Sequence, residues 1–187
     1  MRIVTAGNKS TFAIESQISY LSKDLSITSA LGYFVIYIND HMYGVKSDDA
    51  TMLSCSFDEV SNRVCDKDRH LAPFSYSATP IDIATAYLST FYWEHPDVQP
   101  ELNKLVETFK LYNENNKLTW APDGDAAFDD GSFVLQFDYA DKVRLIAFKN
   151  TEQYENTINE IWIPIDMFYE ILVEWRDCFA TYLSMPA

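Results

Sequence analysis

Two adjacent apolar runs near residue 140 constrain the fold most strongly, because together they predict a β-hairpin. In residues 133–139 (FVLQFDY), large aromatic and aliphatic side chains occupy every second position, which is the period of a strand with one face against a core. Residues 142–148 (KVRLIAF) form a second such run after a short turn at Ala140 and Asp141. We expect the two runs to pair antiparallel, so the fold must contain a sheet.

Further strands are expected in the N-terminal half. Residues 31–38 (LGYFVIYI) are rich in β-branched and aromatic side chains, which is typical of a strand with both faces largely covered. Asn39 and Asp40 supply turn chemistry, so residues 41–45 are expected as the return strand of a hairpin. Residues 11–19 indicate either a short half-buried strand or the start of a helix. Brief strands are also expected at residues 51–54, 118–121 and 161–163.

Helices are predicted in four places. Ser56 followed by Glu59 makes a capping-box pattern, which predicts a helix from Ser56 through Val64. Pro80 suits the first turn of a helix capped by Thr79. Apolar residues at helical spacing predict two more helices, at residues 101–112 and 165–182.

The order of these elements predicts the fold class. Strands and helices come in clusters without regular β-α-β alternation, so we expect an α+β fold. It should consist of a mainly antiparallel β-sheet packed against several α-helices, with a long amphipathic helix at the C-terminus. A chain of 187 residues is of the size of one domain, so we expect a single domain over residues 1–187.

The chain is strongly acidic, with 28 Asp and Glu against 14 Lys and Arg and a formal net charge of −14. This balance argues against nucleic-acid binding, which requires Lys and Arg opposite the phosphates. It also disfavours docking on anionic membranes. Two interpretations stay open: the charge serves solubility alone, or it attracts a basic protein partner and speeds association.

Nothing in the sequence predicts export or membrane insertion. Residues 1–10 contain no apolar run, so they do not form a signal peptide. The most hydrophobic stretch, residues 31–38, is far shorter than the roughly 20 residues that a membrane-spanning helix needs. The three cysteines have no CxxC spacing and are expected as free thiols. We therefore expect a cytoplasmic protein.

Local motifs for catalysis or cofactor binding are missing from the sequence. The three histidines, His41, His70 and His95, lie in no recognisable catalytic motif, and there is no GxSxG elbow. The five glycines are scattered, so neither GxGxxG nor a P-loop occurs. No His or Cys pairs stand at zinc-ligand spacing. We expect no cofactor, no metal site and no enzymatic activity.

One loop is unusually dense in carboxylates. Residues 122–130 (PDGDAAFDD) have no basic residue after them until Lys142. The loop is interpreted as a solvated turn, as a protein-contact surface, or as a site for metal or catalysis. It lacks the glycine and glutamate positions of an EF-hand. The carboxylates concerned are Asp123, Asp125, Asp129 and Asp130.

A second group of carboxylates lies along the predicted closing helix. They share one face, opposite the apolar residues. Most such stripes are solvated helix faces. The four are Asp166, Glu170, Glu174 and Asp177.

Several segments together resemble the immunity protein 42 family. They cover most of the chain and are weakest between residues 66 and 117. The segments are 11–16 (TFAIES), 31–38 (LGYFVIYI), 43–45 (YGV), 49–60 (DATMLSCSFDEV), 120–138 (WAPDGDAAFDDGSFVLQFD), 143–149 (VRLIAFK) and 162–179 (WIPIDMFYEILVEWRDCF).

The resemblance implies a bacterial immunity protein that binds and neutralises the C-terminal domain of a cognate toxin. Such toxins are delivered by contact-dependent inhibition or related secretion routes, and many are nucleases with basic substrate grooves. The resemblance implies no catalytic residue. We hypothesise that Asp123, Asp125, Asp129 and Asp130 face the toxin. The alternative function is a carboxylate-based divalent-metal-binding module or hydrolase built on the same loop.

Overall fold

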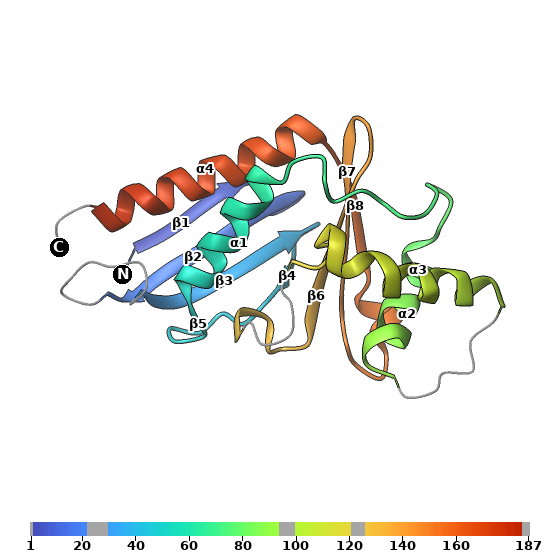
Figure 1. Ribbon diagram of the computed structural model, residues 1–187. Coiled ribbons are helices and arrows are strands. Elements are labelled where there is room, and N and C mark those ends of the chain that lie inside the picture. The colour runs from blue at the N-terminus through green and yellow to red at the C-terminus, as the bar shows by residue number, and fades with distance from the viewer. Residues whose placement is uncertain (1, 22–29, 94–99, 121–125, 185–187) are drawn as a thin grey trace.

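The computed structural model describes residues 2–21, 30–93, 100–120 and 126–184, and within them the chain forms two antiparallel sheets and four α-helices (Figure 1). The first sheet has the strand order β1-β2-β3-β4, and β5 also pairs with β3. Its strands are β1 (Arg2–Gly7), β2 (Phe12–Tyr20), β3 (Leu31–Ile38), β4 (His41–Tyr43) and β5 (Thr51–Met52). The predicted strand at 31–38 is therefore confirmed, and residues 11–19 form a strand rather than a helix.

The second sheet contains the predicted hairpin and has the order β6-β7-β8. Its strands are β6 (Ser132–Asp138), β7 (Lys142–Lys149) and β8 (Asn159–Pro164). Phe133 lies opposite Phe148 in the antiparallel register. The strand expected at residues 118–121 is only an isolated bridge between Thr119 and Leu135 of β6, beside which Trp120 N donates to the Val134 carbonyl at 2.9 Å; residue 121 lies outside the described residues.

The helices lie in two pairs. α1 (Leu53–Cys65) and α4 (Ile165–Ser184) lie together over the first sheet, whereas α2 (Pro80–Phe91) and α3 (Pro100–Asn116) pack beside the second sheet (Figure 1). Short 3-10 turns occur at η2 (Ala126–Phe128) and η3 (Tyr154–Thr157). This arrangement confirms the α+β class and the long C-terminal helix. None of the helices in the described ranges is long and apolar enough to cross a membrane.

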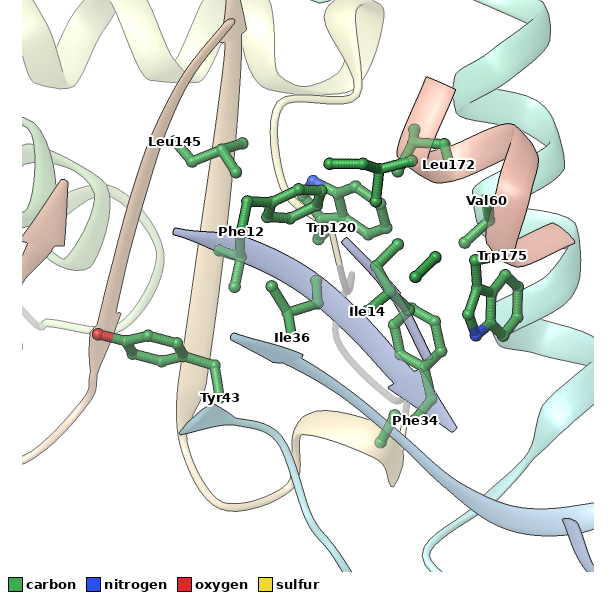
Figure 2. Close-up of a cluster of buried hydrophobic side chains, with 14 of the residues drawn as sticks. Phe12, Ile14, Phe34, Ile36, Tyr43, Val60, Trp120, Leu145, Leu172 and Trp175 are labelled. Atoms are coloured by element: carbon green, nitrogen blue, oxygen red, sulfur yellow. The ribbon is translucent and has the colours of Figure 1, made fainter. Parts of the chain in front are cut away.

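Two hydrophobic clusters share the second sheet, because alternate residues of β6 and β7 point to opposite faces. Val134 and Leu145 belong to the cluster beneath α1 and α4, and Leu135 and Ile146 belong to the cluster beneath α2 and α3. Figure 2 shows the first cluster, in which side chains from β2 and β3 meet those of the helices and Trp120. The labelled members include Phe12, Ile14, Phe34, Ile36, Val60, Leu172 and Trp175.

Local predictions at helix starts had two outcomes. The cap of α2 is confirmed, since Asp82 N donates to Thr79 Oγ1 at 3.2 Å. The Ser56 cap is wrong: α1 begins at Leu53, and its N-cap residue Met52 makes no side-chain cap. Leu53 is fully buried, and its N–H bonds to the Ala30 carbonyl, so tertiary packing starts the helix directly after β5.

Candidate functional site

The acidic loop is attached to the first sheet through η2. Ala127 and Phe128 are buried, and the Phe128 ring lies edge-on to Phe34 of β3 with centroids 6.3 Å apart. The Ala127 carbonyl also accepts from Val45 N at 2.7 Å. The chain around residues 126–128 is thus held against the edge of β3, where β4 and β5 both pair with that strand.

The four predicted contact carboxylates differ in their surroundings. Asp123 and Asp125 lie outside the described residues. Asp129 is exposed. Asp130 pairs with Lys149 Nζ at 2.7 Å and accepts from Ser132 N at 3.1 Å. No basic residue follows the loop in the sequence until Lys142, but β7 brings Lys149 back beside Asp130.

The carboxylate stripe predicted on α4 is an exposed face of the molecule. Asp166, Glu170, Glu174 and Asp177 are all exposed. Asp166 pairs with Lys67 at 3.0 Å, and Asp177 pairs with Arg176 at 2.8 Å. Glu170 and Glu174 make no ion pair within the described part of the chain, so α4 presents uncompensated negative charge beside α1.

A buried arginine joins the helices to the second sheet. Arg63 of α1 is 1% exposed and donates to Gln136 Oε1 at 2.8 Å and to the Thr119 carbonyl at 2.7 Å. Gln136 Nε2 continues the network to Asp138, which also accepts from the Tyr169 hydroxyl at 2.8 Å. Burial, followed by the nearby Asp138 charge, raises the pKa of Tyr169 above its ordinary value. These polar groups satisfy one another, which indicates a structural role.

A second charged cluster lies on the other face of the first sheet. The Glu15 carboxylate accepts from Lys46 at 2.6 Å, from Lys9 at 2.5 Å and from the Tyr33 hydroxyl at 3.1 Å. Burial raises the pKa of Glu15, but the hydrogen bonds from Lys46 and Lys9 outweigh it and lower the pKa to about 2. Through Lys9 and Lys46, the cluster holds the β1–β2 turn and the β4–β5 connection against the sheet. No local pattern in the sequence indicates it.

The described residues show no arrangement typical of metal binding or nucleophilic catalysis. No group of three or more His, Cys, Asp or Glu side chains within the described ranges could hold a metal ion. His41 is exposed, His70 is buried, and His95 lies outside the described residues. Cys55, Cys65 and Cys178 are free and exposed thiols.

Comparisons with known proteins identify a family and a similar fold. The model of the family described as immunity protein 42 matches residues 1–178. Among solved structures, the chain is similar to the crystal structure of CdiI from Burkholderia dolosa AUO158, with a TM-score of 0.56 and 15% identity over 95% of this chain and 99% of that one. At that identity the likeness shows the fold alone. No protein with curated annotation matches the sequence.

Proposed function

The chain belongs to the immunity protein 42 family, and we propose from this premise that it blocks one cognate toxin by binding the toxin's C-terminal domain in the cytoplasm of the producing cell. Family membership makes the chain a toxin-neutralising immunity protein, a role that requires a protein partner and indicates a non-enzymatic mechanism. Delivery of the toxin by contact-dependent inhibition or a related secretion route is part of the proposal. We also propose that residues 1–187 act as one domain. The two hydrophobic clusters support this, because both include residues of the second sheet.

The observation that carries the proposal about the toxin is charge. A net charge of −14 suits a nuclease, because the substrate groove of a nuclease is basic in order to hold phosphates. Opposite charges speed the encounter of two proteins and hold them in register. Asp129 and the α4 carboxylates are exposed on this protein and available for such an encounter.

We place the toxin contact at the acidic loop, with the roles of its carboxylates separated. Asp123, Asp125 and Asp129 are proposed to face the toxin. Asp130 belongs to the same loop, but its pairing with Lys149 and with Ser132 N gives it a structural contribution as well. The exposed position of Asp129 and the anchoring of η2 against β3 support this placement.

The proposal is tested with a triple variant, Asp123→Asn/Asp125→Asn/Asp129→Asn, and a quadruple variant that adds Asp130→Asn. We expect the triple variant to bind the purified toxin domain at least about tenfold more weakly at low ionic strength, with a smaller loss at high salt because screening already weakens the pairs. Co-expression with the toxin domain should then rescue growth poorly.

A control for total charge uses exposed carboxylates elsewhere on the molecule. The variant Asp141→Asn/Glu152→Gln/Glu155→Gln removes an equal number of negative charges, three, from exposed positions around β7 and η3. We expect its affinity for the toxin domain to be almost that of the wild type. Equal affinity and equal salt dependence of the loop variant and the wild type, both folded, would refute the loop as the contact. Inhibition of the toxin's nuclease activity by the wild-type protein tests the toxin class separately.

A further inference from the structure

A small hollow opens where β5 ends and α1 begins. Its volume is about 250 Å³, and its lining includes Leu31, Ala50, Met52, Cys55 and Ala126. Most of these side chains are apolar. The volume lies below the roughly 300–1,000 Å³ of small-molecule sites, so the hollow suits one inserted side chain better than a cofactor.

The walls of the hollow belong to well-anchored elements. Leu31 lies opposite Met52 in the β3–β5 pairing, and the Leu53 N–H that starts α1 bonds to the Ala30 carbonyl. Ala126 comes from η2, whose Ala127 carbonyl accepts from Val45 N. A preformed apolar depression on such elements costs little ordering when a partner side chain enters it. Met52, at the edge of the hollow, is 53% exposed, so it remains accessible to a partner.

Uncompensated carboxylates lie in the lining of the hollow and beside it in the chain. Asp49 lines it and is exposed, and Asp129 lies one turn from Ala126, whose carbonyl accepts from Asp129 N at 3.4 Å. Neither carboxylate makes an ion pair within the described ranges. Lys46, three residues from Asp49, pairs with Glu15, and Lys149 pairs with Asp130, the residue next to Asp129.

We propose that this hollow receives an apolar side chain of the toxin domain, and that basic residues beside that side chain meet Asp49 and Asp129. The inference rests on the proposed function and deepens it, because it adds a specific apolar anchor to an otherwise electrostatic contact. Charge complementarity selects the occupant: a basic protein surface matches these carboxylates, and one apolar residue on it fills the centre. Binding energy in protein interfaces concentrates in such centrally buried anchors, with polar groups around them excluding water.

The first test fills the hollow without changing any charge. Ala126→Leu places extra carbon atoms at the half-buried Ala126, and Ala180→Leu makes the same substitution at an exposed position on α4. We expect Ala126→Leu to weaken toxin binding at least tenfold, equally at low and high salt, while Ala180→Leu binds like the wild type. Wild-type affinity of folded Ala126→Leu would overturn the proposal. A change in self-association of Ala126→Leu with unchanged toxin binding would assign the hollow to a second copy of this chain and would also overturn it.

The second test uses the thiol that lines the hollow. In a variant retaining only Cys55 (Cys65→Ser/Cys178→Ser), the rate of alkylation by iodoacetamide should fall at least tenfold when the purified toxin domain is bound. A variant retaining only Cys65, ten residues further along α1 and thus about 15 Å away, should react at an unchanged rate. An unprotected Cys55 in a complex that demonstrably forms overturns the hollow but leaves the proposed function intact. Failure of the wild-type protein to bind the toxin domain at all overturns both.

Discussion

Replacement of Arg63 by alanine should destabilise the protein far more than any replacement of a surface arginine. The guanidinium is almost fully buried, and its donors satisfy four acceptors at 2.6–3.2 Å: Glu59 Oε1, Gln136 Oε1 and the carbonyls of Lys117 and Thr119. Of these, the Gln136 and Thr119 acceptors are buried. The alanine variant removes the Arg63 donor from both acceptors.

The magnitude follows from those two acceptors. Leaving one buried acceptor unsatisfied costs about 1–3 kcal/mol, and breaking a buried charged contact by removing one partner costs about 3–5 kcal/mol. Glu59, the ionic partner, is 23% exposed and can be rehydrated, which places the expected loss near the lower limit, at about 3 kcal/mol. Arg63 also lies 4.4 Å from the Trp120 ring centroid, so its loss opens space beside that ring.

Urea denaturation measures this loss directly. With a slope of about 2 kcal/mol per molar urea, the midpoint of Arg63→Ala should fall by roughly 1.5 M. Arg69→Ala is the matched control, because Arg69 is 77% exposed and pairs with Asp66 at 3.3 Å. It should change the free energy of unfolding by no more than about 0.5 kcal/mol. Equal midpoints for the two variants would refute the structural role assigned to Arg63.

Three further predictions concern stability and association. The pKa of Glu15 is about 2 in the folded state and near 4.5 when unfolded, so the stabilisation by the ionised carboxylate is present above pH 4.5 and is lost as the pH falls toward 2. Glu15→Gln should therefore lower the free energy of unfolding by roughly 2 kcal/mol at pH 7 in denaturant titrations, and by progressively less at acidic pH. A difference that does not change with pH would contradict this. Gly32→Ala places a Cβ 1.8 Å from the Gln17 carbonyl oxygen and should lower the melting temperature more than Gly131→Ala. At Gly131 a Cβ approaches nothing closer than 3.5 Å, so that variant has only the backbone strain of its φ of +78°. Equal melting temperatures would argue against the close β2–β3 approach. Lys149→Gln removes a cation from a partly exposed ion pair, so the free energy of unfolding should change by less than about 1 kcal/mol. The association rate with the toxin domain, measured by stopped flow, should rise at low salt and stay unchanged at high salt.

Much of the secondary structure could be predicted from local patterns. The hairpin of β6 and β7, the strand at 31–38, the Thr79 cap of α2 and the amphipathic α4 are all confirmed. Each rests on a period of 2 or 3.6 residues or on a capping residue, and these signals are complete within about 20 residues of sequence. The family resemblance could also be identified from the sequence and is confirmed by the family match.

Other elements depended on partners distant in the chain. In β1, Val4 and Ala6 are buried while Ile3 and Thr5 are exposed. So short a segment gives little local signal, and it forms a strand because β2 offers a full antiparallel register. The start of α1 at Leu53 depends on the Ala30 carbonyl rather than on Ser56. Local propensity is a weak prior, and tertiary contacts decide such cases.

The acidic loop shows the same division. Its density of carboxylates and the charge of −14 are properties of the sequence by itself, and they leave open whether the charge serves solubility or attracts a basic partner. Only the tertiary structure decides that Asp130 is paired by Lys149, that Asp129 stays exposed, and that the chain next to it borders an apolar hollow. Electrostatic and packing energies depend on distances through space. The β6–β7 hairpin brings Lys149 near Asp130, whereas residues 15, 46 and 126 meet their partners through contacts between distant parts of the chain that no local pattern encodes.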